Sequence, residues 1–279
     1  MEGRWVRLVP ALIALWWAGT LPAQNRSDSA VGPAPHHVFP WRRNAVLFAH
    51  AAIAIPLYQH MVSSWGRSNG QFHIKDDWTG DGLMQNDEIS HFMWGYVLTK
   101  DLSAVWRWTG LTPGGARALG AAETALLLTL VEFPMDAFNP IEGMGISDLI
   151  FDYAGVGVGL LAASHPRRRW DVKFSVKLDP IGRQRTWFMR SPADMDNYVF
   201  WLTYRPTVPG GDRQPFSVGL GHSVRRGTTG PHGTPVRELY LALGTTIPDL
   251  VRVFAPGVAR FLQPVDAYFA NIGLRKTIR

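Results

Sequence analysis

The sequence predicts an α+β fold with an N-terminal four-helix bundle, a small antiparallel β-sheet after it, and a C-terminal helical segment. Between residues 41 and 165, apolar residues recur at helical spacing in four stretches that turns separate. After His165 the period changes to two, and Val172, Phe174 and Val176 alternate with polar residues. Helices followed by strands, rather than alternating with them, are typical of the α+β class.

The first forty residues indicate export. Arg4 and Arg7 precede an apolar run that begins at Leu8, and a cleavage site follows at Ala23. This layout is that of a secretory signal peptide, which we expect to span residues 1–23. Residues 24–40 are rich in Pro, Ser and Ala and predict a flexible leader. The mature protein is expected in the periplasm and associated with a membrane, without a choice between the inner and outer membrane.

The helical domain is expected to cover residues 41–165. The apolar periodicity predicts helices over Asn44–Val62, Asp87–Trp108, Ala116–Ala137 and Ile146–Ser164. Pro134 should kink or end the third helix, and Ser147 or Asp148 is suited to cap the fourth. In the fourth helix, Gly155 and Gly159 have the spacing that lets another helix pack closely.

The second domain is expected to cover residues 166–279. Its alternating segments predict four strands over Trp170–Asp179, Asn197–Tyr204, Phe216–Val224 and Arg237–Thr245. The following segment, Ile247–Ile272, is apolar and has a roughly helical spacing, with breaks at Pro256 and Pro264. It predicts the C-terminal helical segment.

Composition narrows the function classes. The chain has 279 residues, 46% of them hydrophobic, and no cysteine, which excludes disulfides, thiolate metal sites and cysteine nucleophiles. Its net charge of +6 is unevenly divided, because residues 1–164 are acidic overall and residues 165–279 are strongly basic. A basic half favours anionic lipid or nucleic acid. No nucleic-acid-binding motif accompanies it, so we expect membrane lipid, an envelope component or a second copy as partner, and no nucleic acid.

The most informative feature is a set of ionisable residues spaced four apart in the expected helices. Residues at i and i+4 share one helix face, so each pair should point in one direction, and three such helices would form a polar centre. Buried acids are costly unless they are paired, protonated or bound to a cation. The candidate ligands for Mg, Mn, Zn or Fe are Asp87, His91, Glu132, Asp136, Asp148 and Asp152. A satisfied hydrogen-bond network that fixes helix packing explains the same residues.

A second candidate site is a twelve-residue calcium loop from Asp77 to Glu88. Its ligand positions would be filled by Asp77, Thr79, Asp81, Leu83 (through its carbonyl) and Glu88. Thr79 replaces the preferred acid or Asn, and the preceding segment does not have the pattern of an entering helix. An acidic turn that caps the second helix is the competing interpretation.

Parts of the helical domain resemble a known family. The run Asn86–His91, the Glu132-x3-Asp136 pair and the motif from Gly145 through Asp148 and Asp152 to Gly155 resemble the YfiM-like family of bacterial envelope proteins. The spacing of the polar positions is also similar to that of VanZ-like membrane proteins. Glu88 stands where the family has Lys, and Asp152 where it has Asn. The resemblance implies a periplasmic or membrane-associated role and supplies no established activity.

The sequence therefore predicts a membrane-associated envelope protein with a structural or binding role built on the acid–histidine cluster. The alternatives are a metal-dependent hydrolase acting on lipid or cell-wall substrate and a calcium-stabilised binding protein. No cofactor is assigned beyond a candidate divalent cation, and no catalytic residue is assigned. Because acids in the expected second and third helices are costly inside a bilayer, we favour attachment at the membrane surface, with spanning as the alternative.

Overall fold

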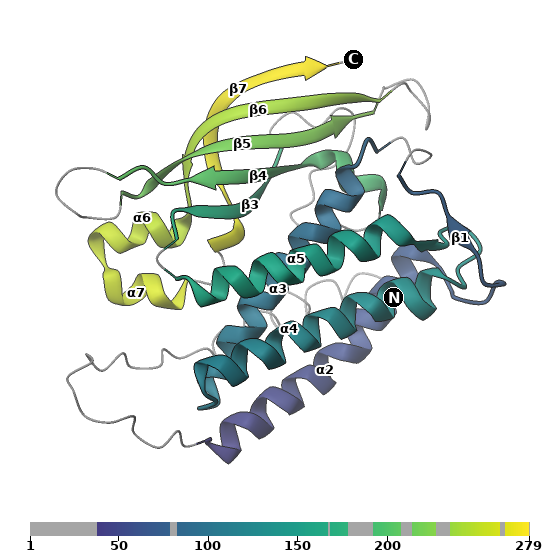
Figure 1. The fold of residues 1–279 in the computed structure, drawn as a ribbon, viewed down its shortest axis with the longest axis horizontal. Helices are drawn as coiled ribbons and strands as arrows, with labels where there is room; N and C mark the ends of the chain where they lie inside the picture. The colour runs from purple at the N-terminus through teal and green to yellow at the C-terminus, as the bar shows by residue number, and fades with distance from the viewer. Residues whose placement is uncertain are drawn as a thin grey trace, which may run out of the picture.

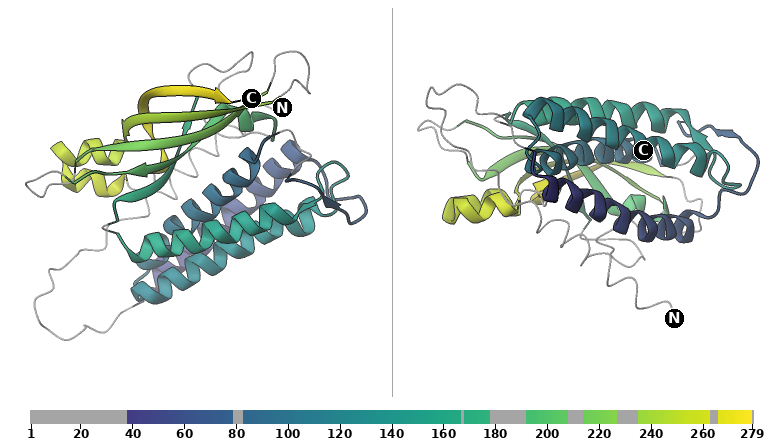
Figure 2. Two further views of the ribbon diagram at one scale, coloured as in Figure 1. Left: turned by 45° about the horizontal axis from the view of Figure 1, so that its top comes forward. Right: turned by 90° about the horizontal axis from the view of Figure 1, so that it is seen from below.

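A computed structural model describes the chain over residues 38–78, 83–166, 168–177, 192–207, 214–226, 235–262 and 266–278. The expected signal peptide, nearly all of the expected leader and the loop positions Thr79 and Asp81 lie outside the described residues. The described chain forms two layers, with helices in one and a sheet in the other (Figure 1), and the turned views show the same separation (Figure 2). The mixed α+β class is confirmed.

The helical layer contains α2, α3, α4 and α5. Their bounds are Pro40–Trp65, Asn86–Trp108, Pro113–Leu130 and Ile146–Ser164. The expected bounds of the fourth helix are therefore correct. A short η1 segment, Val131–Asp136, follows α4, and Phe133 within it has non-helical backbone angles. Pro134, which cannot donate a backbone hydrogen bond, lies in this segment, so the expected break at that position is confirmed.

Helix α3 is the central element of the helical layer. It packs against both α4 and α5 and buries more residues than any other described helix. The crossing with α5 is close because glycines stand at the contact. A Cβ built at Gly155 would overlap the backbone of Phe92, and one built at Gly159 would crowd Tyr96. The expected close packing at Gly155 and Gly159 is confirmed, and α3 is the helix that uses it.

The sheet has five antiparallel strands in the order β3-β4-β5-β6-β7. Their bounds are Trp170–Val176, Tyr198–Tyr204, Phe216–Arg225, Val236–Thr245 and Ala270–Ile278. The short η2 helix, Pro192–Asn197, leads into β4. A separate parallel pair, β1 (Ile74–Lys75) with β2 (Met144–Gly145), joins the two loops at one end of the helical layer.

The expected helical segment Ile247–Ile272 is wrong in its second half. Within the described residues, α6 (Ile247–Phe254) and α7 (Pro256–Phe261) are α-helical and residues 266–267 have 3-10 geometry. From Ala270 the chain forms the fifth strand, β7. In β7, Ile272 and Leu274 pair with Leu243 and Leu241 of β6. The spacing of these two apolar residues is that of a strand, and the edge of β6 supplies the hydrogen-bond partners that the local sequence does not reveal.

The two layers meet where α3 lies across β3 and β4. Met93 of α3 packs against Tyr198 and Phe200 of β4, with Val172 and Phe174 of β3 around them. The other face of the sheet has its own core around Trp201, Ala242 and Phe269. The sheet therefore holds the side of α3 that the other helices leave uncovered.

Large apolar surfaces stay exposed on the helices and on the sheet. Three described helical segments, Pro40–Ser63, Pro113–Asp136 and Ile146–Ser164, are long and apolar enough to cross a membrane by length and composition. On the sheet, one row of paired leucines runs across four strands and is exposed at every position: Leu202, Leu220, Leu241 and Leu274. Exposed apolar area of this extent is typical of proteins that contact a membrane or another protein.

Candidate functional site

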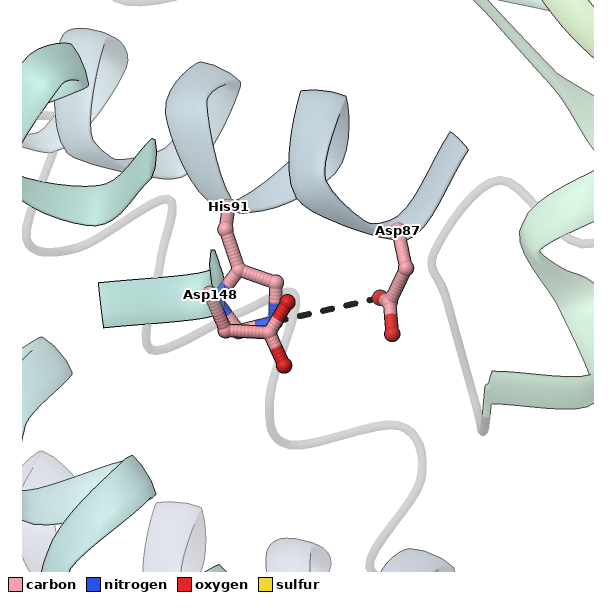
Figure 3. A group of neighbouring side chains, drawn as sticks. All are labelled: Asp87, His91 and Asp148. Atoms are coloured by element: carbon pink, nitrogen blue, oxygen red, sulfur yellow. Dashed lines mark ion pairs between the residues drawn. The ribbon is translucent and has the colours of Figure 1, made fainter. Parts of the chain in front are cut away.

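The candidate site is built around His91 of α3. Asp87 and His91 lie one helical turn apart on α3, and Figure 3 shows their side chains projecting from the same side of the helix. Asp87 lies in the first turn, where the exposed N–H groups of the helix stabilise a negative charge. The sharing of one face by this pair follows directly from its spacing of four.

Four carboxylates from three elements surround the imidazole. His91 Nδ1 is 3.1 Å from Asp152 Oδ1 and 3.8 Å from Glu132 Oε1. His91 Nε2 is 3.8 Å from the Oδ1 atoms of both Asp87 and Asp148. The 3.1 Å contact is a hydrogen bond in which the protonated Nδ1 donates to Asp152. The two ring nitrogens thus have different surroundings, since among the described residues only Nδ1 lies within hydrogen-bond distance of a carboxylate.

Parallel pairing of β1 with β2 brings a further cation and a further acid to this centre. Because Lys75 is paired with Gly145, its side chain reaches the start of α5, where Nζ lies 3.2 Å from Asp148 Oδ2. The Oδ2 atom of Asp77 accepts a hydrogen bond of 3.4 Å from the backbone N–H of Asp148. The expected cap at Ser147 or Asp148 is therefore wrong: the N-cap residue is Gly145, and the nearby carboxylate is that of Asp77.

Gly145 permits this arrangement. Its backbone N–H donates to Glu132 Oε2 at 3.0 Å, which fixes the carboxylate of η1 against the start of α5. A Cβ at this position would overlap the carboxylate oxygens of both Asp148 and Asp77. Any side chain at position 145 would therefore displace these carboxylates.

The cluster is deeply buried. Asp148, Asp152 and Glu132 are at most 1% exposed, and each has a buried carboxylate oxygen that accepts no hydrogen bond from the described residues. The accessible edge is formed by Asp87 and His91, whose side chains are 12% and 18% exposed. Buried carboxylate oxygens without a donor are costly, so they indicate a bound proton or a bound cation.

The pKa values indicate which groups hold protons. Burial lowers the pKa of His91, but the hydrogen bond to Asp152 and the charges of Asp148 and Asp87 outweigh it, so the pKa lies well above its ordinary value. Burial raises the pKa of Glu132 to about 8, against the lowering effect of His91. Without a cation, the imidazolium and a protonated Glu132 reduce the negative charge of the cluster.

Asp136 lies at the margin of the cluster. Burial, followed by the charge of Glu142, raises its pKa to about 6. It belongs to neither of the two groups within the described residues whose side-chain atoms lie close enough to share an ion, which are Asp87–His91–Asp148 and His91–Glu132–Asp152. Of the six residues singled out in the sequence, the structure thus brings five into one cluster around His91 and leaves Asp136 beside it.

The expected calcium loop is described only in part, because Thr79 and Asp81 lie outside the described residues. Asp77 is turned toward the start of α5, Leu83 belongs to a small core with Met195 and Val224, and Glu88 is fully buried in the first turn of α3. The segment before the loop contains the strand β1 instead of an entering helix. The calcium loop and the acidic turn both stay predictions, because two of the loop's ligand positions lie outside the described residues.

The sequence analysis missed Lys75, Gly145 and the role of Asp77 in the cluster. No local pattern singles out Lys75, because its contact with Asp148 depends on the pairing of β1 with β2. Gly145 has a weak signal, since a glycine directly before a helix with an acid in its first turn suits a close approach of backbone and carboxylate.

Comparisons with known proteins do not add to this geometry. No family model, no curated protein and no solved structure matches the chain. The likeness to the YfiM-like and VanZ-like families therefore stays a prediction, and the function is argued from the site.

Proposed function

We propose that this protein is a membrane-associated protein of the cell envelope whose acid–histidine cluster binds one divalent cation. The ligands are His91 Nε2 and the carboxylates of Asp87 and Asp148. The cation joins α3 to the start of α5, so its role is structural or binding. The observation that carries the proposal is the environment of His91, in which Nδ1 is hydrogen-bonded to Asp152 while Nε2 lies at the same 3.8 Å from two carboxylates.

This arrangement suits a metal-binding histidine. A metal-binding imidazole generally donates its other N–H to a carboxylate, which fixes the ring and its tautomer. Asp152 fills that position here. One imidazole and two carboxylates suit Zn, Mn or Fe, whereas calcium prefers oxygen ligands alone. The donorless Oδ1 atom of Asp148 is a buried ligand atom that a cation would satisfy.

The competing interpretation is a network without metal. In that case the charges of Lys75 and protonated His91 offset the carboxylates, and the cluster only fixes the packing of α3 against α5. Calorimetric titration of chelator-treated protein with zinc and manganese separates the two. We expect one site per chain that His91→Ala abolishes and that the exposed His60→Ala control retains. Titration without heat for either metal would contradict the proposal.

A metal-dependent hydrolase is the second candidate, and one observation favours it. Asp87 and His91 form the accessible edge of the cluster, so a cation bound there could keep a position open for water. A metal-bound water loses its proton near neutral pH and becomes a nucleophile. Hydrolysis of a lipid or cell-wall substrate that depends on added metal and is lost in Asp87→Asn would support this role.

Membrane association is supported by the exposed apolar surfaces of the helices and the sheet. We propose contact with the membrane surface, because α3, which lies between α4 and α5, carries charged residues along much of its length, among them Lys100, Asp101 and Arg107. Export by the signal peptide belongs to the same proposal. The calcium alternative predicts that a chelator lowers the melting temperature and that Glu88→Gln removes this sensitivity.

A further inference from the structure

A second polar feature lies at the opposite end of the helical layer from the acid–histidine cluster. It is a cavity of about 590 Å³ between the end of α3, the start of α4, the end of α5 and the neighbouring part of the sheet. Residues of α6 complete its wall. The helices thus have an acidic centre at one end and this cavity at the other.

The lining of the cavity is strongly basic. Eight Lys and Arg side chains line it against three Asp side chains, an excess of five positive charges. Six of these cations are Lys100, Arg107, Arg117, Arg168, Arg169 and Arg205. A concave surface lined mainly by charges of one sign concentrates their field and attracts ions of the other sign.

The three acids are already shared among several cations. Asp171 lies 3.0 Å from Arg168 and 2.8 Å from Lys173, and Lys100 is 3.4 Å away. Asp249 pairs with both Arg205 and Arg252. Burial raises the pKa of Asp171, but the surrounding cations outweigh it and hold that pKa well below its ordinary value. Asp171 is therefore ionised, and the three acids together are outnumbered by the eight cations of the lining.

Three of the lining arginines have no carboxylate partner among the described residues. Arg107 donates to the backbone oxygen of Leu111, and Arg169 donates to the hydroxyls of Tyr204 and Thr207. Arg117 makes none of the ion pairs within the described chain. In addition, the Nε atoms of Arg168 and Arg205 are buried without a hydrogen-bond acceptor there. The arginines of the cavity therefore have N–H groups that can donate hydrogen bonds to a bound anion.

The chemistry of these donors favours phosphate. Guanidinium groups bind phosphate oxygens with two parallel hydrogen bonds, which makes arginine the preferred residue for such groups. Next to the cavity, α6 has an apolar outer edge. Leu250 and Phe254 are exposed, with Phe254 at 82%, while Asp249 and Arg252 of the same helix line the cavity. Figure 1 shows α6 and α7 toward the same end of the molecule as the last turns of α5.

We propose that this cavity binds the phosphate group of an anionic phospholipid while the apolar edge of α6 enters the adjoining lipid. The charged wall holds the headgroup, and the exposed apolar side chains of α6 match the acyl region that continues from it. An amphipathic helix with one charged and one apolar face lies in this manner at a membrane interface. The inference deepens the proposed membrane association and is independent of the cation cluster.

The test is flotation of the full chain with vesicles of phosphatidylcholine, with and without phosphatidylglycerol. The double variant Arg117→Gln/Arg169→Gln removes two cations of the cavity that are not paired with acids. The control Arg67→Gln/Lys276→Gln removes two exposed cations elsewhere. Basic residues near an anionic surface contribute about fivefold each, so the cavity variant, which lacks two of them, should lose roughly 10- to 30-fold in affinity for phosphatidylglycerol vesicles. The control should lose less than about 3-fold. Arg117→Lys/Arg169→Lys should restore only part of the affinity, because lysine keeps the charge but cannot make the two parallel hydrogen bonds of a guanidinium group.

Three results would overturn the inference. Equal losses in the cavity and control variants would show only a general attraction of charge to the surface. Equal binding to both kinds of vesicle would remove the role of the anionic headgroup. Thermal stabilisation by inorganic phosphate that the cavity variant loses, without any preference for phosphatidylglycerol vesicles, would assign the cavity to free phosphate. His91→Ala, which tests the cation site, should leave the vesicle binding unchanged, so the two proposals fail separately.

Discussion

At the scale of single residues, the two ring nitrogens of His91 have different roles in the proposed cation site. Nδ1 is held by Asp152, and Nε2 faces Asp87 and Asp148. The face that Asp87 and His91 share could be predicted from their spacing alone. Their approach to Asp148 could not, because it depends on the crossing of α3 with α5. Lys75 was beyond prediction for the same reason, as its contact arises through β1 and β2.

The protonation of Glu132 makes the metal-free protein sensitive to pH. Its folded pKa of about 8 lies above its ordinary value of 4.5, so the folded protein keeps a proton that the unfolded chain has lost between these values. Stability should therefore fall as the pH rises through this window, by about 1.4 kcal/mol per unit of pKa difference at most. Asp136 and His91 act in the same direction, because their folded pKa values are also raised.

The melting temperature of chelator-treated protein, measured by circular dichroism from acid to mildly alkaline pH, tests this. We expect a decrease toward alkaline pH that Glu132→Gln makes shallower, because the amide stays neutral at every pH. A divalent cation should offset the decrease, since its positive charge stabilises the ionised form of the nearby Glu132 carboxylate. An equal slope in the wild type and the variant would show that Glu132 does not hold the proton.

At the scale of elements, the crossing of α3 with α5 positions the cluster. The two helices approach closely at Gly155, where an added Cβ would overlap the backbone of Phe92. Two residues on, a Cβ at Gly157 would meet nothing within 4 Å. The chain thus offers a matched pair of glycines in one helix.

Gly155→Ala should destabilise the protein by about 1–3 kcal/mol, because helices that cannot approach are forced apart or strained. Gly157→Ala should stabilise it by about 0.5–1 kcal/mol through helix propensity. Urea unfolding of both variants gives the comparison. Similar effects of the two substitutions would contradict the close crossing. Gly155→Ala should also weaken metal binding, since Asp152 and His91 belong to the two helices that would separate.

Elements with a strong local pattern were predictable, and those that depend on partners were not. Helix α5 has its expected bounds because a largely apolar stretch, whose acids share one helix face, begins after Gly145 and ends before Pro166. The start of strand β7, up to Ile272, was expected to be helical, because its apolar residues continue from α6 and α7 and its pairing with β6 is a distant contact. The residues that line the basic cavity come from many separate segments, so no single stretch of sequence predicts it.

At the scale of the whole molecule, charge is divided along the helices. The acid–histidine cluster lies at the starts of α3 and α5, and the basic cavity lies at their ends. Both positions suit the helix dipole, which favours anions at the start and cations at the end. A surface-attached protein exposes both ends to one compartment, whereas a spanning protein would separate them.

The absence of cysteine makes this distinction measurable. Gly114→Cys introduces a thiol at the start of α4, near the cavity, and Ile141→Cys introduces one in the exposed loop beyond η1, at the other end. We expect a membrane-impermeant maleimide to label both positions in intact spheroplasts as fully as in detergent. Labelling of only one position before detergent would show that the helices cross the membrane.

The most direct test of the central claim is elemental analysis of protein purified without added metal. The account predicts about one equivalent of a divalent metal per chain, zinc, manganese or iron, bound where His91 Nε2 faces Asp87 and Asp148. Protein that contains no stoichiometric metal and keeps its full thermal stability in a chelator would contradict it.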